Sequence, residues 1–195
     1  MHVFLGITGA SGAPYAARLL EGLAAAGCEI GLSASAAGIE VLATELHGDA
    51  SLPRDEVLAR LLEAAPEARV YAPNDWKAPY ASGSAKVDAY VICPCSMSTA
   101  ASIAAGAMAN LVHRAASVAL KEERKLVLVP RETPLSAIHL ENMLRLRRAG
   151  ATILFAAPGF YAGAERVEDL VDFVAGRVLD QLGLPNVLVR RWGQE

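Results

Sequence analysis

The chain has 195 residues and a formal net charge of −3, and 53% of its residues are hydrophobic although only 6% are aromatic. This length predicts a single domain spanning residues 1–195, with a core built mainly of Ala, Val, Leu and Ile. Because no basic run occurs, we expect no binding to nucleic acid, and because no apolar stretch approaches about 18 residues, we expect no membrane span. The first residues lack the features of a signal peptide, so none is expected.

The three cysteines, Cys28, Cys93 and Cys95, indicate a reducing compartment. Their number is odd, and the spacing of Cys93 and Cys95 is not that of a redox or zinc motif. We therefore expect a cytoplasmic protein in which all three thiols are free and pack as small core residues.

Apolar strand-like runs alternate with helical patterns along the whole chain. The predicted strands cover residues 3–7, 29–33, 68–71, 89–93, 126–129 and 152–155. The predicted helices cover about 13–26, 36–47, 54–64, 98–121, 135–148 and 167–182. The strands are nearly continuous in apolar residues, as expected when both faces are covered, and the alternation predicts a parallel sheet with right-handed crossovers. The predicted fold is therefore a doubly wound, three-layer α/β/α sandwich.

Two segments raise the question of contacts between subunits. Residues 98–109 are almost all Ala, Ser, Gly and Met, a composition that fits either tight packing against the sheet or a subunit contact. From Pro185 onward the chain resembles a tail. Within it, Arg190, Arg191 and Trp192 are expected to dock on a neighbouring subunit.

The first predicted strand runs into a turn with Gly6, Gly9 and Gly12 at every third position. Such a turn allows a ligand to approach the backbone, and free amide groups at the start of the next helix attract a phosphate. The spacing is not the dinucleotide fingerprint, and glycines also occur at such turns for steric reasons alone. The second strand ends at Ser33 and Ser35 without the acidic residue that holds the ribose of NAD. A mononucleotide is therefore favoured over NAD.

A third polar loop follows the fourth predicted strand, at residues 95–99. Each Ser or Thr in it, taken singly, is an ordinary helix cap. The loops after strands one, two and four would nevertheless all lie at the carboxyl edge of one parallel sheet, where open α/β folds bind ligands. This convergence favours a cofactor site.

Four basic residues are candidates for binding an anion: Arg114, Lys121, Arg131 and Arg177. Arg114 and Lys121 lie two turns apart on one face of a predicted helix. Arg131 directly follows a buried strand, where ligands bind, and its guanidinium matches the geometry of a phosphate. The histidines are scattered and no Asp-rich motif occurs, so we expect a phosphate to be held here without a metal.

Residues 74–84 form a predicted loop that is rich in turn formers yet contains Trp76, Lys77 and Tyr80. Loops that only connect elements rarely carry bulky aromatic residues at their tips, so we expect this loop to close over a ligand. The alternative is that Trp76 only anchors its own loop, and that Tyr161 only caps the edge of the sheet.

Together these motifs resemble those of the flavin prenyltransferases of the UbiX type, formerly described as aromatic-acid or polyprenyl-hydroxybenzoate decarboxylases. The resemblance covers nearly the whole chain and is densest in six segments. These are residues 6–12, 74–84, 91–99, 126–143, 158–161 and 167–174. The run at 126–136 is long and specific.

The resemblance implies a fold related to flavodoxin and Rossmann domains and an enzyme that binds reduced FMN and dimethylallyl monophosphate. This transferase would join the dimethylallyl group to N5 and C6 of the flavin without using a metal. The product, prenylated FMN, would pass to a UbiD-type decarboxylase. Members of the family assemble as dodecamers with active sites at subunit interfaces, so a homo-oligomer of this kind is implied here.

Matched residue by residue, the resemblance implies three sets of site residues. The FMN-binding set is Gly9, Ala10, Ser11, Ser35, Ser96, Met97, Ser98, Thr99 and Arg131. The set that binds the prenyl phosphate is Arg114, Lys121, Tyr161 and Arg177. The catalytic set is Ser11, Glu45, Trp76, Lys121 and Glu132.

The chemistry of these side chains agrees with the implied reaction. The four cations would neutralise charge on a departing phosphate, which stabilises the transition state electrostatically. Trp76 and Tyr161 would offer aromatic faces to an allylic cation. Glu132 is a candidate proton relay for the second bond, and Ser11 is a candidate hydrogen-bond partner of a flavin ring nitrogen.

Two other functions share part of this pattern. A flavin-dependent cysteine decarboxylase would require a catalytic His and an Asn-rich substrate loop, neither of which is evident, and would not need four cations. A flavin carrier without enzymatic activity would keep the three polar loops but would not need Lys121, Glu132 or Arg177.

Overall fold

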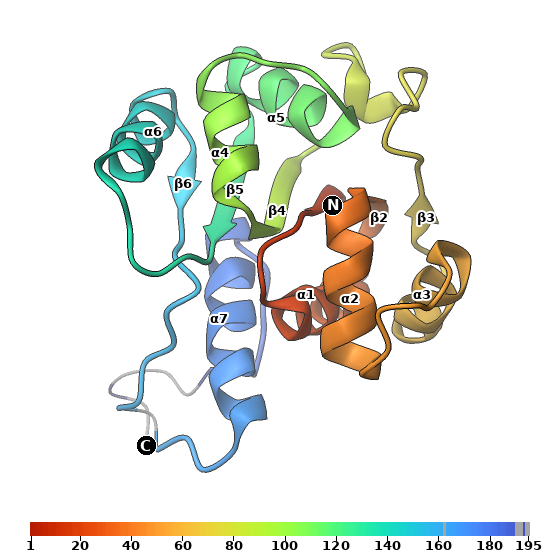
Figure 1. Ribbon diagram of the computed structural model, residues 1–195, viewed down its shortest axis with the longest axis vertical. Coiled ribbons are helices and arrows are strands. Elements are labelled where there is room, and N and C mark those ends of the chain that lie inside the picture. The colour runs from red at the N-terminus through yellow and green to blue at the C-terminus, as the bar shows by residue number, and fades with distance from the viewer. Residues whose placement is uncertain (162, 190–192, 194–195) are drawn as a thin grey trace.

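Six parallel strands form the centre of the computed structural model, which describes residues 1–161, 163–189 and 193. They are β1 (His2–Ile7), β2 (Glu29–Ala34), β3 (Arg69–Val70), β4 (Ala89–Cys95), β5 (Lys125–Pro130) and β6 (Thr152–Ile153). Their order in the sheet is β3-β2-β1-β4-β5-β6, and every neighbouring pair is parallel (Figure 1). The chain winds outward from β1 to one edge and then from β4 to the other, which places the topological switch point between these two strands.

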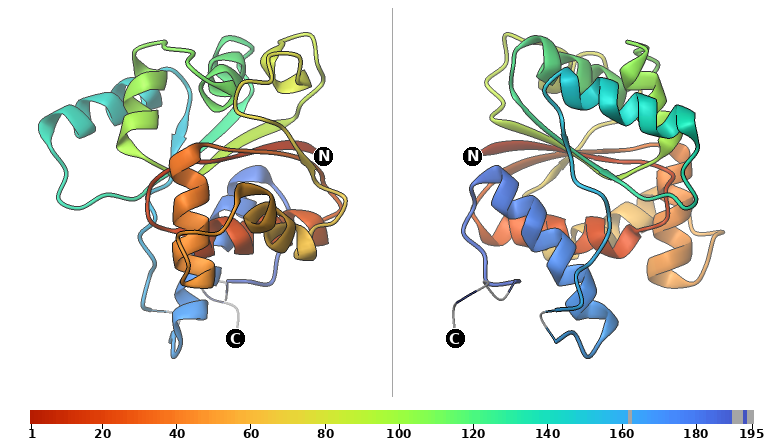
Figure 2. Two further views of the ribbon diagram at one scale, coloured as in Figure 1. Left: turned by 45° about the vertical axis from the view of Figure 1, so that its right-hand side comes forward. Right: turned by 90° about the vertical axis from the view of Figure 1, so that its left-hand side faces the viewer.

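Helices cover both faces of the sheet (Figure 2). One face carries α1 (Ala13–Ala25), α2 (Ala36–His47), α3 (Arg54–Leu61) and α7 (Val167–Leu182). The other carries α4 (Met97–Ala104), α5 (Leu111–Lys121), α6 (Ala137–Arg148) and the short 3-10 helix η2 (Pro79–Ala81). A second 3-10 helix, η1 (Leu62–Ala64), continues α3. The predicted three-layer α/β/α fold is confirmed. None of the helices in the described ranges combines the length and the hydrophobicity that a membrane-spanning helix requires.

Alternate residues of β1 face two separate cores. Phe4 packs with Tyr80 and Tyr90 on the side of α5, whereas Leu5 and Leu20 belong to the core on the side of α1. All five side chains are at most 1% exposed. Each such Leu or Phe contributes roughly 1.5–3 kcal/mol through burial. Burial on both faces explains why the strands are continuous in apolar residues.

The helix expected over residues 98–121 is wrong as a single element, because the structure divides it into α4 and α5. Gly106 ends α4 with a φ of 75°, a left-handed conformation that favours glycine. The backbone N–H groups of Gly106 and Ala107 return to Ile103 O and Ser102 O, the pattern of a Schellman motif. Asn110 then begins α5 by accepting from a backbone N–H. Helix α4 packs chiefly on α6 and also on β5 of the sheet, so its small residues allow close packing within the chain, and the subunit contact stays a prediction.

All three cysteines are free, as predicted. Cys93 and Cys95 are buried in β4, whereas Cys28 is only partly buried. Burial raises the pKa of the Cys95 thiol to about 12 and raises the pKa of Cys93 well above its ordinary value. These two thiols are therefore neutral core residues at physiological pH.

The described part of the C-terminal tail folds back on α7 of its own chain. Asn186 Nδ2 donates to Gly176 O at 3.4 Å and to Asp180 Oδ1 at 3.0 Å. Gly176 makes room for this segment, because a Cβ at that position would lie 2.4 Å from a methyl group of Val189. The residues expected to dock on a neighbour, Arg190, Arg191 and Trp192, lie outside the described residues.

Candidate active site

The loops that follow β1, β2 and β4 meet at the carboxyl edge of the sheet. The Thr8 hydroxyl donates to Pro94 O at 2.9 Å and accepts from Ser96 N at 2.8 Å, which joins the first and third loops. Ser35 N donates to Ile7 O at 3.0 Å, which joins the second loop to the end of β1. The predicted convergence of three polar loops is therefore confirmed.

The residues predicted to bind FMN fall into two groups by exposure. The first group is exposed or half-buried and consists of Gly9, Ser11, Ser35, Ser96, Ser98 and Arg131. The second group is buried and consists of Ala10, Met97 and Thr99. The hydroxyls of Ser35 and Ser96 accept from backbone N–H groups and so begin α2 and α4. A ligand at this edge would meet the backbone of Gly9, the side chains of the other residues in the first group, and chiefly the backbone of the second group.

Two glycines of the first turn are required by its geometry. A Cβ at Gly9 would lie 2.5 Å from the Cβ of Ala37, at the start of α2. Gly12 has a φ of 132°, which favours glycine. The turn therefore leaves its backbone open to close approach by a ligand.

Glu45 of α2 occupies the start of α1. Its Oε2 accepts hydrogen bonds from Gly12 N and Ala13 N, both at 2.8 Å. A carboxylate is stabilised there by the partial positive charge of the helix N-terminus. The expectation that free amide groups at this helix start attract a phosphate is therefore wrong for Gly12 and Ala13. Glu45 does lie beside the glycine-rich turn.

Arg131 reaches the same turn from the end of β5. Its Nε donates to Ser11 O at 3.1 Å. Within the part of the chain that the structure describes, the two terminal nitrogens of this guanidinium donate no hydrogen bond. Those nitrogens are available for an anion at the carboxyl edge.

Tyr15 is a neighbour of this cluster that the sequence analysis missed. Its ring packs on Gly12, where a Cβ would lie 2.9 Å from the Cδ2 atom. Burial raises the pKa of Tyr15, the nearby carboxylate of Glu45 also raises it, and Arg131 lowers it. Its position in the first turn of α1, where a side chain points back toward the helix N-terminus, was the available signal.

A second group of predicted site residues gathers on α5 and on the loop before η2. Arg114 Nε donates to Ala81 O at 2.9 Å, so helix and loop form one unit. Lys121, at the end of α5, forms an ion pair with Glu122. Trp76 projects from the loop and is 51% exposed.

The sequence led us to expect Tyr80 at the tip of this loop, but the structure places it elsewhere. Its side chain is 1% exposed, its hydroxyl lies 2.6 Å from His2 Nε2, and its ring centroid lies 4.7 Å from that of Phe4. Gly31 makes this possible, because a Cβ there would lie 2.0 Å from the Tyr80 hydroxyl. Tyr80 anchors the loop in the core, and Trp76 remains free to meet a partner.

Within one chain, Lys121 lies near the amino ends of the parallel strands and Arg131 lies near their carboxyl ends. Lys121 precedes Lys125, the first residue of β5, and Arg131 follows Pro130, the last. The six residues of β5 span about 20 Å. A single chain therefore does not bring Lys121 into the cluster around Arg131.

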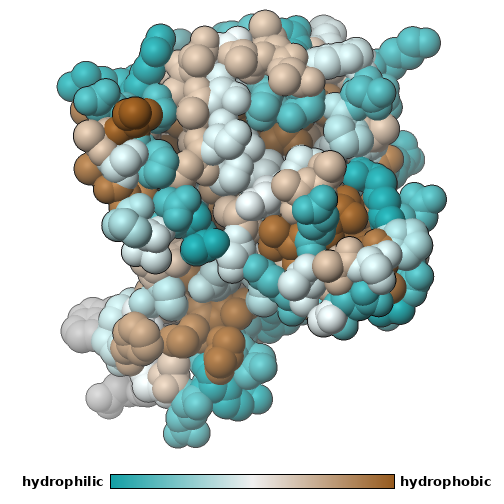
Figure 3. All heavy atoms as spheres, viewed as in Figure 1, coloured by the Kyte–Doolittle hydropathy of each residue, from teal (hydrophilic) through white to brown (hydrophobic). Residues whose placement is uncertain are grey.

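A third group lies beside α7. Tyr161 is 63% exposed, and its ring meets that of Phe173 edge-on with the centroids 5.8 Å apart. Arg177 lines an open pocket of about 300 Å³ against residues 152–155 and 157, and its Nη1 donates to Asp180 Oδ2 at 2.9 Å. Figure 3 shows hydrophobic atoms gathered near the start of α7, where Val167 is 70% exposed.

Glu132 follows Arg131 and is half-buried. Its Oε1 accepts from Thr133 N at 3.0 Å, which holds the carboxylate near the carboxyl end of β5. Among the described residues, no three His, Cys, Asp or Glu side chains are grouped so as to hold a metal ion. Charged side chains near this edge include Arg131, Glu132 and Glu45, and Arg54 Nη1 donates to Ala34 O at the end of β2 at 3.1 Å.

A doubly wound sheet with polar loops at its carboxyl edge defines an α/β protein of the class that binds ligands, often nucleotides, at this edge. The family model Flavoprotein matches residues 1–179. The flavin prenyltransferase UbiX of Pseudomonas aeruginosa is 52% identical, in an alignment that covers 100% of this chain and 95% of that protein. The chain belongs to the UbiX flavin prenyltransferase family.

Two crystal structures share the fold. One is that of AnUbiX (PadA1) in complex with FMN and dimethylallyl pyrophosphate, with a TM-score of 0.89, 38% identity, and coverage of 100% of this chain and 98% of that one. The other is a dodecameric FMN-dependent UbiX-like decarboxylase from Escherichia coli O157:H7. It has a TM-score of 0.83 and 44% identity, and the match covers 94% of this chain and 96% of that one.

Proposed function

We propose that this protein transfers the dimethylallyl group of dimethylallyl monophosphate to N5 and C6 of reduced FMN. The observation that carries the proposal is the meeting of three polar loops and Arg131 at one edge of the sheet, in a chain of the flavin prenyltransferase family. The related AnUbiX structure contains FMN and a dimethylallyl ester, the two kinds of molecule that the reaction needs. The choice of a single phosphate in the donor follows the family resemblance.

The flavin site is proposed at the carboxyl edge of the sheet. The open backbone at Gly9 and the exposed Ser11 would lie against the flavin, and Ser35 and residues 96–99 would complete its surroundings. Because Glu45 occupies two amide groups at the start of α1, the FMN phosphate would be balanced by Arg131 and by hydroxyl and backbone donors of the loops.

The prenyl-phosphate site is proposed to be completed by neighbouring subunits of a homododecamer. Lys121 lies about one strand length from Arg131 within one chain, so a second copy is needed to place both at one ligand. The E. coli relative is dodecameric, which supports an assembly of this size. Arg114 and Trp76 belong to the same unit as Lys121 and would be delivered with it.

The cations of this site are proposed to stabilise the departing phosphate. Arg114, Lys121 and Arg177 would balance its charge, and Tyr161 would donate a hydrogen bond to it. Trp76 would cover the allylic group with an aromatic face and keep water away from it.

Three side chains are proposed to control protons at the flavin. When bound, the reduced flavin supplies the two positions that receive the prenyl group. Glu132 would accept the proton released on formation of the second bond. Ser11 and Glu45, both at the glycine-rich turn, would orient hydrogen bonds to the ring.

We further propose that the product, prenylated FMN, is released in the cytoplasm to a UbiD-type decarboxylase. The protein would then be a supplier of cofactor and would not itself decarboxylate an aromatic acid. Neutral, buried Cys93 and Cys95 suit a reducing compartment.

The proposed reaction is tested by mixing the protein with reduced FMN and dimethylallyl monophosphate without oxygen and with a chelator present. We expect a change in the flavin absorbance spectrum together with stoichiometric release of inorganic phosphate. An unchanged spectrum with no phosphate released would contradict the proposal, and activity only with dimethylallyl pyrophosphate would correct the donor.

A further inference from the structure

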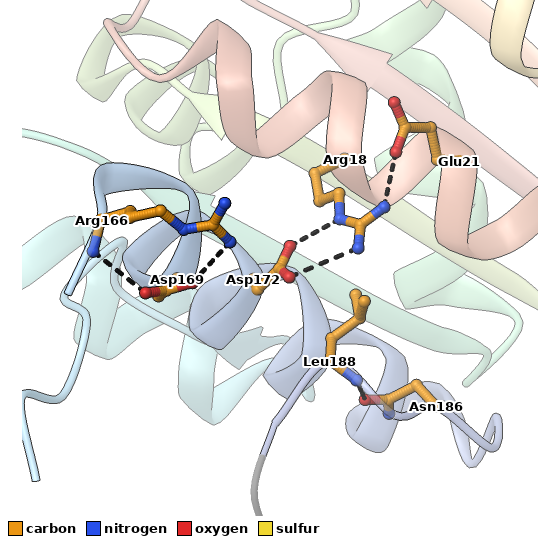
Figure 4. A network of polar contacts seen from close by, with 7 residues as sticks. All are labelled: Arg18, Glu21, Arg166, Asp169, Asp172, Asn186 and Leu188. Atoms are coloured by element: carbon orange, nitrogen blue, oxygen red, sulfur yellow. Dashed lines mark hydrogen bonds and ion pairs between the residues drawn. The ribbon is translucent and has the colours of Figure 1, made fainter. Parts of the chain in front are cut away.

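A partly exposed ion pair joins the first helix to the last one. Arg18 of α1 contacts Asp172 of α7 through two hydrogen bonds, from Nε to Oδ1 at 2.5 Å and from Nη2 to Oδ2 at 3.3 Å (Figure 4). Nη1 of the same guanidinium donates to Glu21 Oε2 at 2.7 Å. The side chains of Arg18 and Asp172 are 36% and 27% exposed, so solvent screens the pair only in part.

The geometry of this pair is selective for arginine. The guanidinium fork meets both oxygens of one carboxylate, which fixes direction as well as distance. Hydrogen bonding to Asp172, and then to Glu21, raises the pKa of Arg18 further above its ordinary value. A lysine at this position would keep the charge but would lose the two-point contact.

Each end of α7 is held separately from this pair. At the start of the helix, Asp169 Oδ2 accepts from Glu165 N and Arg166 N, both at 3.0 Å. Near its end, Asn186 contacts the helix and also accepts from Leu188 N (Figure 4). These contacts define where α7 starts and stops, but only the Arg18–Asp172 pair, among the polar contacts drawn there, connects α7 to α1.

The pair lies next to the residues proposed to bind the prenyl phosphate. Phe173, the next residue after Asp172, is the ring against which Tyr161 packs edge-on. Arg177 follows Asp172 on the same helix, little more than one turn further along. A rotation or shift of α7 against α1 would therefore move both proposed phosphate ligands together.

Apolar packing also joins α7 to α1. Leu179 covers Gly22 of α1, where a Cβ would lie 2.8 Å from its Cδ1 atom, and Val174 and Val178 are buried in the same core. Contacts of this kind are non-directional. The ion pair supplies the directional contact that they lack.

We propose that Arg18 and Asp172 are positioning residues that hold Tyr161 and Arg177 in the register needed to bind the prenyl phosphate. The inference rests on the proposed function, because it assumes that these two residues bind the donor. Neither Arg18 nor Asp172 is proposed to touch a substrate.

The test compares Asp172→Asn and Arg18→Lys with wild-type protein in full-length, assembled form. The matched control is Glu56→Gln, which removes the exposed ion pair of Glu56 with Arg60 on α3. For each protein we would measure the dissociation constant of FMN by fluorescence titration, and kcat and KM for dimethylallyl monophosphate. Amide hydrogen exchange over residues 167–177 gives a readout that does not depend on activity.

We expect Asp172→Asn to raise the KM for the donor about tenfold, with kcat and the FMN dissociation constant changed less than twofold. Arg18→Lys should give a smaller rise in the same direction, and both should speed exchange in α7, while Glu56→Gln changes none of these values. The double variant should be no worse than Asp172→Asn, because both substitutions remove one contact.

Three results would overturn the inference. They are an unchanged donor KM in both variants, an equal rise in the KM and in the FMN dissociation constant, and a lower melting temperature as the sole effect. Failure of the proposed function gives a different result, because wild-type protein would then form no prenylated flavin. The milder Arg18→Lys variant keeps the test decisive if Asp172→Asn does not fold.

Discussion

The carboxylate of Glu45 lies 2.8 Å from the backbone nitrogen of Gly12, so one helix supplies the N-terminal cap of another. The contact couples α2 to the turn proposed to bind FMN. It also fills a position at which a phosphate would otherwise compete. Glu45 therefore links the stability of the domain to the shape of its candidate site.

We expect Glu45→Ala to lower the free energy of unfolding by about 1 kcal/mol, because two amide groups at the start of α1 lose their acceptor. Glu45→Gln retains an acceptor oxygen and should cost less. Urea unfolding measures both. Glu40→Ala, at an exposed position on the same helix, is the control and should be close to neutral. Equal stability of Glu45→Ala and wild-type protein would contradict the capping role.

Arg131 provides a second prediction. Arg131→Met should weaken FMN binding about tenfold, since a charge-assisted contact to phosphate and the link to Ser11 O are both lost. The FMN affinity of Arg131→Lys should fall between those of wild-type protein and Arg131→Met, because lysine keeps the charge but lacks the forked guanidinium. Fluorescence titration gives the dissociation constants, with exposed Arg145→Lys as the control. An undiminished affinity in Arg131→Met would place the FMN phosphate elsewhere.

Separation of Lys121 from Arg131 predicts complementation between subunits. Lys121→Met and Arg131→Met should each lose most turnover, and assemblies formed from both chains together should recover part of it. Recovery is expected because some interfaces would combine an intact Lys121 from one chain with an intact Arg131 from the other. Mixed assemblies that stay as inactive as either parent would mean that one chain supplies both residues.

Glu132 gives the sharpest division between binding and chemistry. Glu132→Ala should leave the FMN dissociation constant within about twofold and slow prenyl transfer by 10²-fold or more, as loss of a general acid–base group does. Exposed Glu141→Ala is the control. If turnover is unchanged in Glu132→Ala, this carboxylate is not the proton relay.

The buried thiols of β4 predict how stability depends on alkaline pH. Burial raises the pKa of Cys95 to about 12 and raises that of Cys93, so both stay protonated in the folded protein when the unfolded chain has begun to ionise. Above about pH 9 the unfolded state therefore binds fewer protons, and the free energy of unfolding falls as pH rises, by up to about 1.4 kcal/mol per pH unit for each thiol. Urea unfolding between about pH 9 and pH 11 measures how steeply the free energy of unfolding falls with pH. This slope should be shallower in the Cys93→Ala/Cys95→Ala double variant than in wild-type protein, which shares all its other titratable groups. Equal slopes would show that the thiols ionise alike in both states.

Secondary-structure elements whose limits are marked by local residues were predicted well from the sequence. Helix α2 was placed at its observed limits, since Ser35 caps its start and Gly48 ends it in a left-handed conformation. The same kind of signal was present at Gly106 and Asn110 but was outweighed by the helical pattern on both sides. Element boundaries that depend on a single glycine are easily missed when the flanking residues favour helix.

Features that depend on tertiary contacts were harder to predict. Tyr80 was expected at a loop tip, but the space above Gly31 draws it into the core. Glu45 was placed near the flavin turn only through resemblance, and nothing local showed that it caps α1 across 33 positions of sequence. Lys121 and Arg131 are ten positions apart in the sequence, yet a whole strand separates them, and this separation emerges only when the sheet is assembled.

We propose above all that this protein builds a prenylated flavin from two separate molecules. The most direct measurement is the mass of the flavin released after anaerobic incubation with reduced FMN and dimethylallyl monophosphate. We expect the mass of FMN increased by one five-carbon prenyl unit. Recovery of unmodified FMN, with the donor unconsumed by an assembled and flavin-loaded protein, would contradict it.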